Sequence, residues 1–245
     1  MPTPPPVDRK RLVKAFWAAV AISVLCNVLQ PWGRYALYPF ALLGTWAHEM
    51  GHGLTALLLG GSFEKLVLFS DLGGYASHTA LGFFRRPLVS MGGLLGPSIV
   101  GGGLIVLGAR SEKTARLALW LLVAALGLSV VIWIRSLFGV VAISAVAVVL
   151  AGVALKGGVF AELFMTQLIG IQLCLALVSD VNYMFTKSFQ RGGETLLSDT
   201  GQIAEHWLLP YWVWGGLIAA TSFAILLSAF YVAWIRGMVD DDPTT

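Results

Sequence analysis

Long apolar runs separated by short polar breaks dominate this chain. Each run is about 20 residues or longer, which is the length a helix needs to cross the hydrocarbon core of a bilayer. The pattern predicts transmembrane helices over residues 12–30, 36–60, 87–108, 116–134, 137–155, 159–185 and 209–235. We therefore expect an all-α polytopic membrane protein with about seven (six to seven) transmembrane helices.

One boundary between these helices has no ordinary breaking signal. Residues 116–155 form a nearly unbroken apolar stretch, long enough for two spans. Arg135 and Ser136 provide its clearest polar interruption, although the pair contains neither Gly nor Pro. We place the turn there.

The segment between the second and third predicted helices has a different character. Leu66–Phe69 is β-prone, and Gly73-Gly74-Tyr75 follows shortly after it. The segment is too short to cross a bilayer. It predicts a short β-like hairpin or re-entrant strand on the cytoplasmic side.

The two ends of the chain are polar. We expect residues 1–11 to be a disordered cytoplasmic N-terminus, residues 12–236 to form a single membrane-embedded domain, and residues 237–245 to be an acidic tail. Basic residues before the first apolar run favour a cytoplasmic N-terminus. A short amphipathic helix is predicted over Leu196–His206.

Composition supports a membrane protein and excludes other classes. The chain is 57% hydrophobic and 12% charged, whereas soluble domains carry about 25% charged residues. Its main partner is therefore the lipid bilayer. A net charge of +3 is too small to indicate nucleic-acid binding. Cys26 and Cys174 both lie in apolar runs, so neither a disulfide framework nor a cysteine zinc site is implied.

The second apolar run contains a candidate metal-binding motif. His48, Glu49 and His52 form the pattern H-E-x-x-H. Residues four apart share one face of a helix, so both imidazoles can point at a single ion. Glu49 lies one position round the helix, where it can act as a base toward a metal-bound water. A pair of hydrogen-bonded core histidines is the alternative, but ionisable residues inside a membrane are costly and usually functional.

A catalytic zinc site has three protein ligands and an open position, so a third ligand is needed. Asp180 lies late in a predicted span, at a depth that a tilt or break could bring level with the two histidines. It is the preferred ligand, and Asp199 is the reserve. Glu162 lies near the opposite face and is excluded, and His78 is interpreted as a solvated loop residue.

The motif and its surroundings resemble the site-2 protease group, peptidase family M50, and in particular its M50B-like branch. The resemblance rests on the sequence from His48 to Gly53, the Gly60-Gly61 pair and the Gly-Gly-Tyr segment. Weaker similarities follow after the late span, at Ser198-Asp199, Ala204-Glu205, Leu209-Pro210 and Trp212-Val213-Trp214. Together they cover most of residues 40–215.

The resemblance implies an intramembrane zinc endopeptidase that cleaves substrates with a transmembrane segment. His48 and His52 would match the family's zinc ligands, and Glu49 its catalytic glutamate. The family's third ligand is an Asp in a Leu-Asp-Gly or Asn-Pro-Asp-Gly context, whereas this chain has Ser179-Asp180-Val181. Possible substrate-contacting residues are Gly74 and Tyr75, which lie in a segment that could offer a strand edge, and Asn182.

Two other functions remain compatible with the sequence. The altered context of Asp180 favours a non-proteolytic M50-like membrane scaffold, and intramembrane charges with a Gly-rich third span are compatible with an ion or metal transporter. No internal repeat supports the transporter. For the protease we expect a multi-pass protein of a bacterial inner membrane, with its N-terminus in the cytoplasm.

Overall fold

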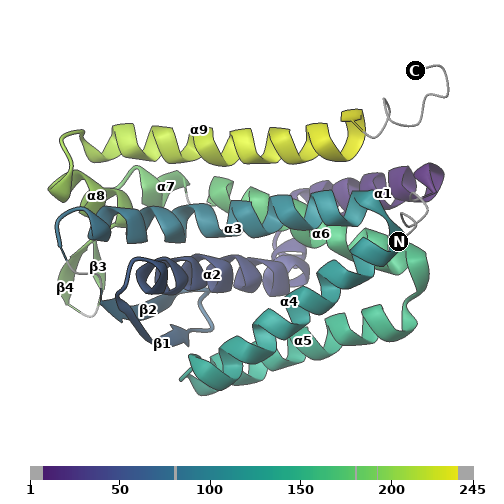
Figure 1. Ribbon diagram of the computed structural model, residues 1–245, viewed down its shortest axis with the longest axis horizontal. Helices are drawn as coiled ribbons and strands as arrows, with labels where there is room; N and C mark the ends of the chain where they lie inside the picture. The colour runs from purple at the N-terminus through teal and green to yellow at the C-terminus, as the bar shows by residue number, and fades with distance from the viewer. Residues whose placement is uncertain (1–7, 80–81, 180, 192, 237–245) are drawn as a thin grey trace.

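The computed structural model describes residues 8–79, 82–179, 181–191 and 193–236. Long helices lie along one another, and the short strands gather at one end of the molecule (Figure 1). In chain order the elements are α1 Arg9–Val28, α2 Trp32–Leu58, β1 Ser62–Leu68, β2 Gly74–Thr79, α3 Arg85–Arg110, α4 Glu112–Ile132, α5 Leu137–Lys156, α6 Gly158–Ser179, α7 Val181–Met184, β3 Ser188–Arg191, β4 Glu194–Leu197, α8 Asp199–His206, α9 Tyr211–Phe230 and the π-helical η1 Tyr231–Arg236.

The prediction of an all-α polytopic membrane protein is confirmed. Within the described residues, six helices are long and apolar enough to cross a membrane, namely α1, α3, α4, α5, α6 and α9 with part of η1. The 27-residue α2 is a further long helix. It carries His48, Glu49, His52 and several glycines, it is not among the six candidate spans, and many of its residues are buried.

The chain ends differ in part from the expected boundaries. Helix α1 begins at Arg9, so residues 9–11 of the segment expected to be disordered are helical. Asp8 explains this start, because its side chain accepts a hydrogen bond from the Lys10 amide (3.0 Å) and caps the helix. The acidic tail expected at 237–245 and residues 1–7 lie outside the described residues.

Glycines allow α2 and α3 to pack closely. A Cβ added to Gly51 would lie 2.2 Å from the Gly92 carbonyl oxygen, and one added to Gly96 would lie 2.5 Å from the Ala47 oxygen. A Cβ on Gly93 would lie 2.2 Å from the ring of His52. Small residues let helix backbones approach in this way within membranes. The Gly-rich span therefore holds α3 against the face of α2 that carries His52.

Replacing Gly93 with alanine is expected to destabilise the protein by about 1–3 kcal/mol, the usual cost of overpacking a well-packed site. The matched control is Gly103→Ala on the same helix, because a Cβ there meets no atom within 4 Å. Thermal unfolding in detergent should show a lower midpoint for Gly93→Ala alone. Equal midpoints for the two variants would contradict the close packing described here.

The turn between α4 and α5 forms at the polar interruption and pairs with the first hairpin. Ser136 caps α5 by accepting a hydrogen bond from the Gly139 amide (3.2 Å). The Leu66 amide donates to the Trp133 oxygen (2.8 Å), and the Arg135 amide donates to the Leu66 oxygen (2.9 Å). The turn needs neither Gly nor Pro, because β1 and the Ser136 side chain bind the backbone groups that the break leaves free.

Strands β1 and β2 form an antiparallel hairpin, with Leu68 opposite Gly74. The α4–α5 turn occupies the outer edge of β1. The hairpin tip is fastened to α2 by two hydrogen bonds, from the Tyr38 hydroxyl to the Ser70 oxygen (2.8 Å) and from the Thr45 hydroxyl to the Leu72 oxygen (2.8 Å). These bonds hold β2 beside the motif on α2.

The polar segment after α6 contains a second hairpin, which the sequence analysis did not predict. Strand β4 pairs with β3 as far as Leu197, opposite Ser188. Helix α8 starts only at Asp199, so the predicted helix over Leu196–His206 begins too early. The reason is local, since Leu196 and Leu197 pair with β3 and Ser198 then caps the helix.

Candidate metal centre

The two histidines of the motif lie one helical turn apart on α2 and face the same point. Their Nε2 atoms are 3.0 Å apart, with the rings at 79° to each other. His52 Nδ1 lies 2.9 Å from the Val89 carbonyl oxygen of α3. A carbonyl can only accept, so Nδ1 carries the proton and Nε2 presents its lone pair. This is the tautomer needed for metal binding through Nε2.

Asp199 supplies the third group from the first turn of α8. Its Oδ2 lies 3.2 Å from His48 Nε2, and its Oδ1 lies 3.5 Å from His52 Nε2. Donors bound to a tetrahedral zinc at about 2.0–2.1 Å are separated by about 3.3 Å. The observed separations, from 3.0 to 3.5 Å, match that requirement. Two imidazoles and one carboxylate are also the donor set of a common class of catalytic zinc sites.

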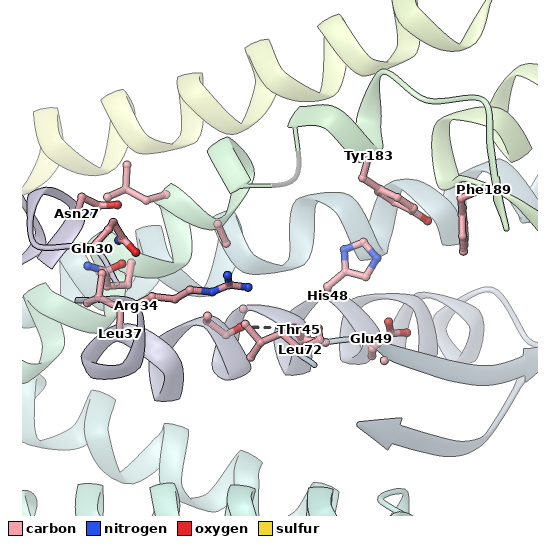
Figure 2. A pocket seen from close by; sticks show the side chains of 17 residues that line it. Asn27, Gln30, Arg34, Leu37, Thr45, His48, Glu49, Leu72, Tyr183 and Phe189 are labelled. Carbon is pink, nitrogen blue, oxygen red and sulfur yellow. Dashed lines mark hydrogen bonds between the residues drawn. The ribbon is translucent and has the colours of Figure 1, made fainter. Parts of the chain in front are cut away.

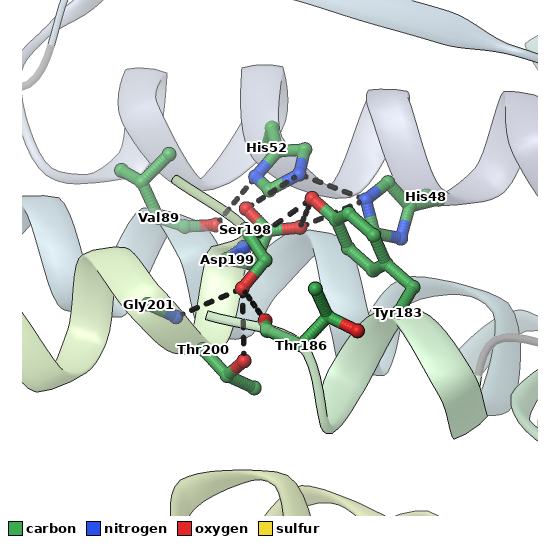
Figure 3. A network of polar contacts seen from close by, with 9 residues as sticks. All are labelled: His48, His52, Val89, Tyr183, Thr186, Ser198, Asp199, Thr200 and Gly201. Carbon is green, nitrogen blue, oxygen red and sulfur yellow. Dashed lines mark hydrogen bonds and ion pairs between the residues drawn. The ribbon is translucent and has the colours of Figure 1, made fainter. Parts of the chain in front are cut away.

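A network of hydrogen bonds fixes Asp199 in place (Figure 3). Ser198 accepts from the Gly201 amide (3.1 Å) and donates to the Thr186 oxygen. The Thr200 hydroxyl donates to the Met184 oxygen (2.8 Å). The start of α8 is thereby attached to the last residue of α7 and to the segment that follows it, and the carboxylate of Asp199 is aimed at α2.

The electrostatic environment keeps Asp199 ionised. Burial by itself raises the pKa of a carboxyl group. Here the interactions of the carboxylate with His52 and His48 outweigh burial, and they lower the pKa of Asp199 well below its ordinary value. The carboxylate form is the one that binds a metal ion.

Glu49 lies beside the three donors but is not one of them. It is 8% exposed and lines the same cavity as His48 (Figure 2). Gly74 of β2 adjoins it, and a Cβ on Gly74 would lie 2.9 Å from Glu49 Cγ. Glu49 therefore has access to a molecule held in front of the histidines, with the hairpin packed against its side chain.

The other predicted site residues are distributed as follows. Asp180, the preferred third ligand, lies outside the described residues. Gly74 lines the cavity next to Glu49. Tyr75 is 39% exposed and lies under the Lys65 ammonium (5.8 Å), and Asn182 is exposed. Neither Tyr75 nor Asn182 is among the described residues that line the cavity.

His78 is not the fully solvated residue that the sequence analysis proposed. Its ring stacks on His52, with centroids 5.9 Å apart at 21°. Burial, and then the nearby imidazole of His52, lowers the pKa of His78 below its ordinary value. It supports one face of the His52 ring and lies outside the group of three donors.

Tyr183 is the main site residue that the sequence analysis missed. Its hydroxyl lies 3.2 Å from Asp199 Oδ2 and accepts from the Asp199 amide (3.3 Å). It also lines the cavity opposite His48. No spacing pattern links Tyr183 to the motif. By contrast, Ser198 before Asp199 could have been recognised as a helix cap.

Replacing Tyr183 with phenylalanine is expected to lower zinc affinity about tenfold to 100-fold, the usual effect of removing a partner of a metal ligand. The aromatic ring remains, so the packing against Phe189 is kept. Zinc titration with a competing chelator measures the change. Phe189→Leu serves as the control, because it alters the same aromatic pair without touching Asp199; equal losses in both variants would argue against the hydroxyl.

No curated protein and no solved structure gave a significant match. A family model described as Peptidase M50B-like matches residues 16–229. This range contains His48, Glu49, His52 and Asp199, and it covers most of the chain. The chain therefore belongs to the M50B-like peptidase family.

Proposed function

We propose that the protein is an intramembrane zinc metalloprotease that hydrolyses peptide bonds of membrane-embedded substrates. The observation that carries the proposal is the group of His48, His52 and Asp199, whose ligand atoms lie within 4.8 Å of one another. Glu49 in the adjoining cavity adds the base that hydrolysis needs. We further propose zinc as the metal and a bacterial inner membrane as the location, with the N-terminus in the cytoplasm.

Each protein group has a defined part in the proposed reaction. The two imidazoles and the Asp199 carboxylate would hold zinc, which, when bound, activates water and polarises the substrate carbonyl. Glu49 would take a proton from the attacking water and return it to the nitrogen of the departing amine. His52 keeps its lone pair on Nε2 through the bond to Val89, and Tyr183 orients the carboxylate.

The cavity supports access for an unwound substrate. It has a volume of about 800 Å³, and it extends from His48 and Glu49 along α2 to Arg34 (Figure 2). A helical substrate hides its carbonyls in internal hydrogen bonds, so the cleaved stretch must be extended. An extended substrate could add to this hairpin as a further strand. The α4–α5 turn occupies the outer edge of β1, so the substrate would pair with β2, the strand beside Glu49.

The scaffold alternative rested on the unusual context of Asp180. Asp180 lies outside the described residues, but Asp199 completes a three-donor group with His48 and His52 among the residues that the structure describes. A complete donor set is the feature that supports an active protein over the scaffold. A transporter would also require a path for ions and has no use for a base beside the metal ligands.

Cleavage of a co-expressed single-span protein tests the proposal. Purified protein in vesicles should cut the substrate within its apolar segment, lose activity in the presence of a zinc chelator and regain it with added zinc. Mass spectrometry locates the cleaved bond. Uptake of zinc into the vesicles without any cleavage of the substrate would instead support a transporter.

A further inference from the structure

The cavity along α2 has two chemically different ends. One end holds His48 and Glu49, and the other holds Asn27, Gln30 and Arg34 with Gln172 of α6. Apolar and small residues line the stretch between them, namely Leu37, Ala41, Gly44, Leu175 and Ala176. The far end is thus a polar site in continuous connection with the metal centre.

Arg34 is the only Lys or Arg among the described residues that line the cavity. Its side chain extends along the cavity toward Thr45 and His48 (Figure 2). Within the described part of the chain, no carboxylate lies within ion-pair distance of its guanidinium. The positive charge is therefore available to a ligand in the cavity.

The neighbouring amides do not neutralise this charge. The Asn27 side chain donates to the Ser23 oxygen (2.8 Å), the Gln30 side chain to the Cys26 oxygen (3.2 Å), and the Gln172 side chain to the Ser23 hydroxyl (2.8 Å). These bonds hold the amide nitrogens against α1. The far end of the cavity therefore contains one guanidinium, that of Arg34, surrounded by amide side chains that are already hydrogen-bonded. A guanidinium binds carboxylates in a bidentate manner.

The spacing along α2 sets the length of substrate between the two ends. Arg34 and His48 are separated by fourteen positions, or about 21 Å of helix. An extended chain advances about 3.3 Å per residue, and the arginine side chain reaches part of the way. A group bound at Arg34 would therefore lie about four to six residues from the bond at the metal.

We infer that the Arg34 end of the cavity is a specificity subsite for an acidic side chain of the substrate, about four to six residues from the cleaved bond. The inference rests on the proposed function, since the metal centre defines the bond that is cut. The subsite would select membrane substrates that carry an Asp or Glu beside their apolar segment. A carboxylate is favoured over a lipid phosphate because the charge lies in the same cavity as the catalytic groups.

The first test measures binding, which needs no cleavage. Glu49→Gln protein in neutral vesicles is titrated with fluorescent apolar peptides that carry Asp or Asn at each position from three to seven residues on either side of the cleaved bond. Asp should tighten binding about tenfold or more at one position in the four-to-six range. Arg34→Gln should remove this preference, and Arg34→Lys, which keeps the charge but loses the bidentate geometry, should retain only part of it.

A charge exchange makes the test specific. Arg34→Glu should prefer Lys over Asp at the same substrate position, whereas Arg86→Gln, which removes an exposed arginine outside the cavity lining, should behave like the parent protein. Equal binding of Asp and Asn peptides at every position would overturn the subsite. An Arg34 effect that appears only with anionic lipid would also overturn it, because Arg34 would then bind a lipid phosphate and not a substrate carboxylate.

Cleavage assays separate this inference from the proposed function. If hydrolysis occurs without any preference for an acidic residue, the subsite is wrong and the protease stands. If the Asp preference in binding depends on Arg34 but no substrate is cut, the subsite stands as a peptide-binding site and the protease is wrong.

Discussion

Replacing Asp199 with alanine is expected to lower zinc affinity by at least about 100-fold, since the loss of a direct ligand should exceed the effect of losing its outer partners. Hydrolysis should disappear with the metal. The variant leaves two imidazoles, which cannot close the three-donor set of a catalytic zinc site. Metal analysis of the purified protein, combined with competition by a chelator, measures the effect.

The matched control is Asp180→Ala, which removes the other candidate carboxylate in the same region of the sequence. It should retain zinc and activity if Asp199 completes the site. The reverse outcome, with zinc lost from Asp180→Ala and kept in Asp199→Ala, would transfer the third-ligand role to Asp180 and refute the geometry described here.

Replacing Glu49 with glutamine is expected to lower kcat about 10²–10⁴-fold, the range of a lost general base. Zinc content should stay unchanged, because Glu49 is not among the three donors. Glutamine keeps the size of the side chain, so its contact with Gly74 should survive. Glu205→Gln on α8, an exposed glutamate, is the control and should keep full activity.

A Glu49→Gln protein that cleaves at the parental rate would exclude Glu49 as the base. If this variant instead lost its zinc, the fault would lie in the folding of the site and not in proton transfer. Measuring metal content and turnover on the same preparation separates these cases.

The sequence could predict the features that depend on local periodicity. The spacing of His48 and His52 alone places both imidazoles on one helical face, and the structure has their Nε2 atoms 3.0 Å apart. Hydropathy likewise located the long helices, and the β-prone Leu66–Phe69 run indicated the first hairpin. The break near Ser136 was found from a single polar interruption.

Local periodicity did not place Asp199 first among the candidates for the third donor. The depth argument favoured Asp180, because it assumed that a ligand must come from within a span. Asp199 comes from a segment outside the candidate spans, and its carboxylate lies 3.2 Å from His48 Nε2 of α2. That placement depends on the β3–β4 hairpin and on the bonds of Ser198 and Thr200, and none of these leaves a periodic hydrophobic signal.

The donor set also joins distant parts of the polypeptide. Two donors come from α2, and the third comes from α8 near the end of the chain. A bound ion is therefore a cross-link that closes a long loop, and its binding energy opposes the separation of these two helices. Removal of the ion should loosen α8 and the β3–β4 hairpin first, which would expose them to proteases before the helical bundle itself comes apart.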